Sequence, residues 1–525
     1  MSSPRIYPRM RDMRVTPVAA SIWITLLICL RISIHLKDAV VVTGVLVALA
    51  ATLAAWRVRD RHNERGRPRP RRMRTPVGSL RLGWAAILIA SGAAAIVAGS
   101  ACDAHARDPT VRLIDSGRTY VTLRVRLIDD PAAMASRWNR TRFYADARVE
   151  QVEVSHGQWQ PSNVNVMLMG AGIGEYVRDD RVLVRGSIDS QFRSDPPFVG
   201  AMEAENIELT ERPGGWVSIV RHVRSSMRQV CSTLTVQGQA LVPGVAIGDD
   251  RAMNEELSDA MKTSSLTHLT AVSGTHIAIM LSLIVSAVPG RGLIRAGATL
   301  AAMSLLVAVV GPQPSVIRAV LTASVGVAGL LLKRPGGAQA ALSTVVVLVL
   351  LIDPFSARAV GFALSVLATW GVVGPAQQWN EAVKHAVRSD AWYARCVRRL
   401  LQACCVPLAA QILVAPVLLL MSPLLPVWGV IANVLVSPVI APACVCALMT
   451  AVCAPWWPAA ATLMAHVAQT FTGWIAWVAT WVSSWPMANV SWPQGIEGTI
   501  VLASAAIGML SVSTVVRRCR RRMSH

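Results

Sequence analysis

Charged residues are scarce in this sequence, and their scarcity excludes an ordinary soluble domain. Only 15% of the 525 residues are Asp, Glu, Lys or Arg, whereas soluble domains contain about 25%. Hydrophobic residues make up 53% of the chain, and many apolar runs approach the ~20 residues that a helix needs to span a bilayer. The composition therefore predicts a polytopic α-helical membrane protein.

Several catalytic signatures are also missing. The sequence has no G-x-x-x-x-G-K-[ST] loop, so ATP hydrolysis of the P-loop kind is not expected. It has no H-E-x-x-H motif and no His-x-His-x-Asp-His cluster, so no zincin or metallo-β-lactamase metal site is expected either. We therefore expect no enzyme, no bound metal and no cofactor.

The ten cysteines show no zinc-site spacing with histidines. Cys102 and Cys231 flank the one long polar region and could pair if that region faces an oxidising compartment. Two unpaired thiols near the membrane are the favoured alternative.

No cleavable signal peptide is expected, because the first apolar run leads almost directly into a second and predicts a helical hairpin.

Twelve apolar segments are predicted to cross the membrane. They are residues 17–35, 39–56, 80–99, 266–288, 293–311, 315–332, 338–352, 358–378, 400–420, 426–452, 459–482 and 497–515. Lys and Arg gather in short stretches between them, as the positive-inside rule expects of cytoplasmic loops. The net charge of +21 therefore reflects topology and is not by itself evidence for nucleic-acid binding. The same rule predicts two cytoplasmic termini and an extracytoplasmic polar region.

The polar region carries a β pattern. Five short runs alternate between apolar and polar residues, with turn residues between them. They are residues 119–128, 143–154, 163–169, 181–188 and 205–210. Such runs predict a small antiparallel barrel of the OB-like kind. Residues 216–240 predict one amphipathic surface helix.

The expected organisation has five parts. They are N-terminal transmembrane helices with a basic cytoplasmic loop (1–102), an extracytoplasmic OB-like β domain (103–215), the amphipathic helix with a Gly-Asp-Arg element (216–265), a transmembrane bundle (266–515) and a basic cytoplasmic tail (516–525).

Polar elements recur in a fixed order from residue 241 onward. They are Gly248-Asp249-Asp250-Arg251, the stretch His268-Leu-Thr-Ala-Val-Ser-Gly-Thr-His276, Ser315-x-x-Arg318-Ala319, Gly361-Phe362-Ala-Leu364-Ser365, and Asn433 with Pro438. Their order and spacing over roughly residues 241–440 resemble the competence region of the ComEC family. That family comprises the inner-membrane channel proteins of bacterial DNA uptake.

The resemblance implies a channel for single-stranded DNA in the cytoplasmic membrane during natural transformation. It implies as partners the strand itself, the lipid bilayer, a DNA receptor outside, and an ATPase or strand-binding protein inside, with a homo-oligomer left open. The expected DNA-path residues are His268, Ser273, Gly274, His276, Arg318, Ser365 and Asn433. The expected structural residues of the motifs are Gly248, Asp249, Arg251, Gly361, Phe362 and Pro438.

The sequence departs from the family at its end. Many members carry a C-terminal metallo-β-lactamase domain, thought to degrade one DNA strand. This sequence stops ten residues after its last predicted span, so nuclease activity is not expected of it.

The polar residues also have simpler physical interpretations. Arg318 is expected to face a polar cavity rather than to snorkel to the interface. Asp249 and Arg251 are expected to pair at the surface, worth about 0–1 kcal/mol. Asn433 and Pro438 predict a broken helix lining a polar path.

Two other functions stay open. Ser273 or Ser265, with His268 or His276, could supply the nucleophile and base of an intramembrane hydrolase, although no third, orienting acid is evident. A small-solute transporter would need pseudo-symmetric halves, and none is visible in the sequence.

Overall fold

The computed structural model describes residues 15–64, 77–134, 142–155, 157–192, 195–270, 338–387, 389, 391–493, 495 and 497–509, with a few single positions between 294 and 321. These residues belong to two compact units. The N-terminal unit holds Met13–Ser218 and Val347–Arg358, and the C-terminal unit holds Ile219–Val346 and Ala359–His525.

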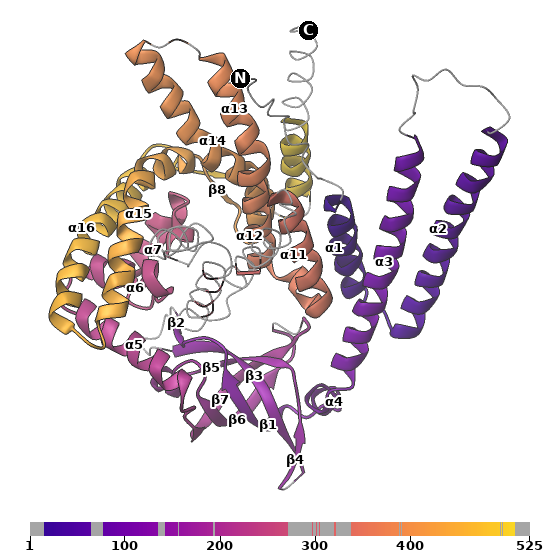
Figure 1. Ribbon diagram of the computed structural model, residues 1–525. Coiled ribbons are helices and arrows are strands. Elements are labelled where there is room, and N and C mark those ends of the chain that lie inside the picture. The colour runs from indigo at the N-terminus through magenta and orange to yellow at the C-terminus, as the bar shows by residue number, and fades with distance from the viewer. Residues whose placement is uncertain are drawn as a thin grey trace. The chain divides into compact units, whose positions relative to one another are not determined.

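Three apolar helices open the N-terminal unit: α1 (Thr16–Arg31), α2 (Leu36–Glu64) and α3 (Val77–Ala106). Both α1 and α2 pack against α3 (Figure 1). A Cβ on Gly99 of α3 would lie 2.9 Å from the Leu36 Cα atom, so glycine at this position allows the backbones to meet. Thr43 Oγ1 donates to the Gly92 carbonyl oxygen at 2.8 Å and ties α2 to α3.

A β domain follows the short helix α4 (Pro109–Asp115). Its strands are β1 (Tyr120–Leu127), β2 (Ala132–Met134), β3 (Arg142–Ser155), β4 (Gln158–Pro161), β5 (Asn165–Gly170), β6 (Arg181–Asp189) and β7 (Phe198–Glu211). They form one sheet in the order β1-β6-β7-β5-β3-β2, with β4 on β3 and a further pairing of β1 with β3. Alternating residues of the strands fill the core, among them Leu123, Val149 and Val184.

The five alternating runs coincide with β1, β3, β5, β6 and the end of β7, so the predicted β domain is confirmed. The prediction of a purely antiparallel arrangement was wrong, because β5 and β7 pair in parallel. The 14-residue β7 is long enough to pair antiparallel with β6 and also to reach β5 with its first residues. Closure of the sheet into a barrel stays a prediction.

The C-terminal unit is mostly helical. Its described helices include α5 (Trp216–Cys231), α6 (Val236–Ile247), α7 (Glu255–Thr263), α12 (Val360–Gly371), α13 (Gln377–Ala386), α14 (Trp392–Leu418), α15 (Gly429–Cys453) and α16 (Pro458–Ser483). Helix α11 (Ala338–Ile352) starts in this unit and ends in the other. A π-helical turn, Val372–Ala376, joins α12 to α13, and a small sheet pairs β8 (Leu424–Pro426) with β9 (Asn489–Ser491).

Two expectations for helices were wrong. Residues 216–240 form parts of two helices, because α5 ends at Cys231 and a new helix, α6, begins after Thr235. The Thr235 side chain caps α6 by accepting a hydrogen bond from the Gly238 amide. The broken helix around Asn433 and Pro438 is instead the continuous α15. A proline removes only one backbone donor, and packing along the whole of α15 holds the helix together.

Helices α15 and α16 pack closely along an alanine-rich seam, and the segment α5–α7 packs along the pair. At one end, Met227 and Val230 of α5 join a core with Ala451 and Ala461. At the other end, Leu257 and Met261 of α7 join a second core with residues of α15 and α16. The segment 219–269 therefore runs beside the helix pair over much of its length.

Four described helices are long and apolar enough to cross a membrane: Gly83–Ala106, Val360–Ala386, Trp392–Leu418 and Gly429–Cys453. They agree with predicted spans at 80–99, 358–378, 400–420 and 426–452. The predicted spans 266–288, 293–311 and 315–332 lie essentially outside the described residues. These four helices support the prediction of a membrane protein, whereas the number of twelve spans stays a prediction.

Candidate functional site

A row of arginines crosses the outer face of the β domain. Arg126 on β1 lies opposite Arg148 on β3 and, on its other side, opposite Arg181 on β6. The residues before and after each of the three are buried, so the three side chains point away from the core. Like charges opposite one another on neighbouring strands repel, and the row therefore produces a local positive field.

Acidic side chains neutralise one end of this row. The Arg181 Nη1 atom donates to a Glu211 oxygen at 2.6 Å, and its Nε atom lies 3.2 Å from a Glu150 oxygen. Among the residues that the structure describes, no carboxylate lies within ion-pair distance of Arg126 or Arg148. The positive charge of these two side chains is therefore available to a solvent-borne anion.

An aromatic side chain adjoins the row. The Arg124 guanidinium carbon lies 4.2 Å from the centre of the Trp159 ring on β4, a cation–π contact. Arg124 Nη1 also donates to Gln151 Oε1 at 2.8 Å, which fixes the guanidinium over the ring. Arg124 shares its face with Arg126, two residues further along β1. Cationic and aromatic groups thus occur together on one exposed surface.

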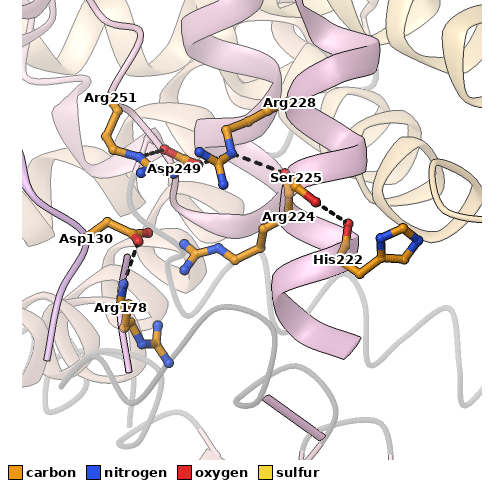
Figure 2. Close-up of polar contacts among 8 residues, drawn as sticks. All are labelled: Asp130, Arg178, His222, Arg224, Ser225, Arg228, Asp249 and Arg251. Carbon is orange, nitrogen blue, oxygen red and sulfur yellow. Dashed lines mark hydrogen bonds and ion pairs between the residues drawn. The ribbon is translucent and has the colours of Figure 1, made fainter. Parts of the chain in front are cut away.

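A second cluster surrounds the Asp249 carboxylate in the C-terminal unit (Figure 2). Gly248 ends α6 in the left-handed conformation (φ 70°) that glycine adopts at little cost. Arg251 then holds Asp249 with two hydrogen bonds, Nε to Oδ1 at 2.9 Å and Nη2 to Oδ2 at 2.8 Å. The expected pair exists. However, Asp249 is only 5% exposed, so its description as a surface pair was wrong.

Two arginines of α5 extend this cluster. Arg228 Nε lies 3.7 Å from Asp249 Oδ2 and donates to the Arg224 carbonyl oxygen at 3.3 Å. Burial alone would raise the pKa of Asp249. Its hydrogen bonds to Arg251 and the charges of all three arginines outweigh burial and hold that pKa below its ordinary value. Arg251 and Arg228 therefore both contact one buried carboxylate, and the charge of Arg224 also acts on it.

A third cluster forms on a strained turn at Ser265. Ser265 has φ = 58°, which is uncommon for a residue other than glycine. Its carbonyl oxygen lies 3.2 Å from His268 Nδ1 and 3.4 Å from Asn433 Nδ2. Because a carbonyl oxygen only accepts, His268 carries its proton on Nδ1 and presents Nε2 as an acceptor. Two expected path residues thus meet on one turn.

The first residue of α15, Gly429, packs closely against this turn. A Cβ on Gly429 would lie 2.8 Å from the Ser265 Cβ atom, so only glycine allows the contact without a shift. The Gly429 carbonyl oxygen accepts from Asn433 Nδ2 at 2.8 Å, and Gln411 Nε2 donates to the Pro426 carbonyl oxygen at 2.7 Å. Polar groups of α14 and α15 therefore converge beside Ser265.

The other motif residues lie elsewhere. Phe362 is 1% exposed and packs in the core, whereas Gly361, its neighbour on α12, has open space around it. The Ser365 carbonyl oxygen accepts from Thr369 Oγ1 at 2.9 Å, and Pro438 is exposed within α15. Ser273, Gly274, His276 and Arg318 lie outside the described residues.

The carboxylates considered as orienting acids for the alternative hydrolase have basic partners. Asp249 is held by arginines and Asp259 by Lys262, and within the described ranges no carboxylate hydrogen-bonds to His268. No group of three His, Cys, Asp or Glu side chains in the described part of the chain could hold a metal ion.

Cys102 and Cys231 are free thiols, and burial raises the pKa of Cys231 to about 12.

Sequence reasoning missed Arg224 and Arg228, and it considered Ser265 only as an alternative hydrolase nucleophile. The first two had a detectable signal: with Arg221 they recur at spacings of three and four residues, which places them on one side of α5. The prediction of an amphipathic helix at 216–240 rested on its apolar face alone.

The strain at Ser265 arises where α7 ends: the Leu266 amide donates to the Met261 carbonyl oxygen at 2.8 Å and the Ser265 amide to the Lys262 carbonyl oxygen at 3.0 Å, so Ser265 is the left-handed residue after the helix. Glycine is the usual residue at this position, and a serine there gives no signal in the sequence.

Comparisons with known proteins agree with the motif residues. Residues 245–517, just over half of the chain, match the family model described as Competence protein. Over 160 residues, 30% of this chain, the sequence is 27% identical to ComE operon protein 3 of Bacillus subtilis (strain 168). That match covers 20% of the relative's length. No solved structure matches.

Proposed function

We propose, on the premise that this chain belongs to the Competence protein family, that it is a membrane channel for the import of single-stranded DNA during natural transformation. The external β domain would receive the strand, and the helical bundle would conduct it. His268 and Asn433 would line the conduit together with Ser273, Gly274, His276, Arg318 and Ser365.

The observation that carries this proposal is the exposed cationic and aromatic face of the β domain. Arg126 and Arg148 can neutralise phosphates, and the indole of Trp159, already stacked with Arg124, can stack with a base. A positively charged surface with aromatic platforms is how many proteins bind single strands without sequence preference. A transporter of small solutes has no need of such a face.

We infer that the β domain is an OB-like barrel. Its five longest strands pair in a ring, β1 with β6, β6 with β7, β7 with β5, β5 with β3 and β3 with β1. This pairing scheme, with five strands and one parallel pair, supports closure. OB folds bind oligonucleotides on an exposed strand face and in adjoining loops.

The chain would act as a conduit rather than an enzyme. A partner would supply the energy, either a cytoplasmic ATPase or strand-binding proteins, and a receptor would deliver DNA outside. Both termini would be cytoplasmic and the β domain extracytoplasmic. Reporter fusions at Gly157 and Ser524 test this orientation: a periplasm-dependent reporter should be active at the first and inactive at the second, and the reverse would refute it.

The experiment for DNA binding uses the full chain in nanodiscs and a fluorescent 12-nucleotide oligothymidylate, followed by anisotropy at several salt concentrations. The double variant Arg126→Ala/Arg148→Ala should weaken binding and reduce the salt slope by about 0.7 for each lost phosphate contact. Arg107→Ala is the matched control, because this 71%-exposed arginine of the same unit pairs with Asp103. Equal losses in the control and the double variant would contradict the assigned face.

In cells, deletion of the protein should abolish uptake of labelled DNA and leave DNA binding at the cell surface intact. Unchanged uptake would reject the channel.

A further inference from the structure

We propose that Tyr120 on β1 and Arg185 on β6 form a second contact point for DNA on the β domain, with Tyr120 stacking on a base and Arg185 binding a phosphate. This inference rests on the proposed function and deepens it, because it sets the direction in which single-stranded DNA crosses the domain. The DNA would run along β1, from Arg126 and Arg148 at one end to Tyr120 at the other. The matched family model covers residues 245–517 and assigns nothing to this domain.

Tyr120 and Arg185 lie on the outer face of the sheet, as the arginine row does. Along β1, Tyr120, Arg124 and Arg126 alternate with buried residues, so their side chains leave the same side of the strand. Arg185 pairs with Thr122, two residues after Tyr120. Tyr120 and Arg185 are therefore diagonal neighbours on one face, at a spacing of about 7–8 Å that aromatic and long side chains can bridge.

Both side chains are open to a ligand. Tyr120 is 52% exposed, and Arg185 is exposed as well. The Tyr120 hydroxyl donates to a Glu205 oxygen at 3.2 Å, which orients the ring by its edge. Within the described ranges, no carboxylate lies within ion-pair distance of Arg185.

The electrostatics of Tyr120 show that Arg185 is near. Desolvation and the Glu205 carboxylate raise the pKa of the Tyr120 phenol, and the charge of Arg185 opposes them. The phenol therefore stays neutral at physiological pH, and the guanidinium is close enough to act on a nucleotide that stacks on the ring. The pair repeats the combination of cation and aromatic ring that Arg124 and Trp159 form.

Charges on β7 favour a path along β1 over a path across the sheet. Strand β7 borders β6 and carries four acidic residues, Glu203, Glu205, Glu208 and Glu211. In the part of the chain that the structure describes, Glu205 and Glu208 belong to no ion pair, so both repel phosphates. DNA that crosses from β1 over β6 to β7 meets these carboxylates, whereas DNA that follows β1 stays between arginines.

The length of β1 suits a short oligonucleotide. Six residues separate Tyr120 from Arg126, which is about 20 Å at ~3.4 Å per residue. A stacked strand advances about 3.4 Å per nucleotide, so this path holds up to about six nucleotides. OB folds bind about 4–16 nucleotides, and the path along β1 falls within that range.

Tyr120→Ala tests the stacking contact in the nanodisc assay. The variant should weaken binding of the 12-nucleotide oligothymidylate about fivefold or more, as expected for one base stacked on an aromatic ring. The salt slope should not change, because no charge is lost. Tyr120→Phe keeps the ring and should bind as the wild-type chain does. Tyr393→Ala is the matched control, because it removes a 61%-exposed tyrosine ring from α14.

A 12-nucleotide abasic strand separates stacking from other effects of the ring. It has the phosphates of the oligothymidylate and no bases, so Tyr120→Ala should leave its binding unchanged. Equal losses on the two strands would show that the ring stacks on no base and would overturn the proposal. So would a loss in Tyr120→Phe as large as that in Tyr120→Ala, because the hydroxyl would then be the contact.

Arg185→Ala tests the phosphate contact. The variant should lower the salt slope by about 0.7 on the oligothymidylate and on the abasic strand alike. Arg185→Lys should keep the slope, because it keeps the charge. Arg107→Ala remains the control for the loss of an exposed arginine. An unchanged slope in Arg185→Ala would overturn the phosphate contact.

The outcomes separate this inference from the proposed function. If Arg126→Ala/Arg148→Ala weakens binding while the Tyr120 and Arg185 variants bind as wild type, the domain binds DNA by another path and only this inference fails. If the wild-type chain binds no oligonucleotide, both fail. Melting temperatures show whether each variant is folded. If Tyr120→Ala melts below wild type, Tyr120→Thr replaces it, because threonine suits a strand, and the same comparison of the two strands decides.

Discussion

Replacing Asp249 by asparagine keeps the shape of the side chain and removes the charge that Arg251 and Arg228 contact. The carboxylate accepts two hydrogen bonds from Arg251, at 2.9 and 2.8 Å, and faces Arg228 at 3.7 Å. The asparagine oxygen can accept one of these bonds, but its amide donors face the donors of the guanidinium groups. Removing one partner of a buried ion pair costs about 3–5 kcal/mol, so Asp249→Asn should be strongly destabilising.

Asp259→Asn is the matched control. Asp259 belongs to the same unit and pairs with Lys262 at 2.9 Å, but both side chains are 63% exposed. Exposed pairs contribute about 0–1 kcal/mol. Tryptophan fluorescence of the purified chain in detergent would report apparent melting temperatures. Asp249→Asn should melt several degrees below wild type and Asp259→Asn within about one degree of it. Equal shifts in the two variants would refute the reasoning.

The effect of Asp249→Asn should depend on pH. The pKa of Asp249 is lowered in the folded chain, so the folded state binds fewer protons at this site than the unfolded state does. The stabilisation is therefore complete above the unfolded pKa, about 3.9, and is lost as pH falls through the lower folded pKa. The gap in melting temperature between wild type and Asp249→Asn should be full at pH 6–7 and narrow below about pH 4. A gap independent of pH would show that the charge is not its cause.

Further predictions concern the turn at Ser265 and the conduit. Gly429→Ala should destabilise the chain by about 1–3 kcal/mol, because its Cβ would lie 2.8 Å from Ser265; Gly473→Ala on α16, with nothing within 4 Å, should be neutral or slightly stabilising in the same melting assay. Arg318→Ala should reduce transformation strongly at normal protein levels, and near-normal transformation would show that this arginine is not part of the path. Ser273→Ala should leave transformation close to wild type, whereas an intramembrane hydrolase would lose its activity without the nucleophilic oxygen.

Local patterns in the sequence were enough to predict the membrane class and the β domain. A segment that crosses the bilayer must be long and apolar because the bilayer core holds no water, and the described part of the chain includes four such helices. The alternating run 119–128 became β1, because alternate residues of a strand face opposite sides. The order of polar elements from Gly248 to Asn433 identified the family, since it requires only residue types and spacing.

Relations between distant segments were decided by the tertiary structure. Strand β5 pairs in parallel with β7, and the same β7 residues, 201–203, pair antiparallel with β6 on the other side. Alternation of apolar and polar residues does not specify the direction of a strand. Helix α15 stays continuous through Pro438, although proline in a long span suggested a break. Packing against α16 and the α5–α7 segment outweighs the loss of the two backbone donors at Pro438 and Pro442.

The Asp249 cluster shows the same division between sequence and structure. Asp249 and Arg251 are two residues apart, so the sequence alone indicated that they pair. Their burial, and the approach of Arg224 and Arg228, follow from the packing of α5 and α6 against α15 and α16. Electrostatic energies depend on burial and on charges that are near in space. The sequence by itself therefore determined that Asp249 and Arg251 pair, and only the folded chain decided that this pair is buried and that Arg228 of the distant α5 approaches the same carboxylate.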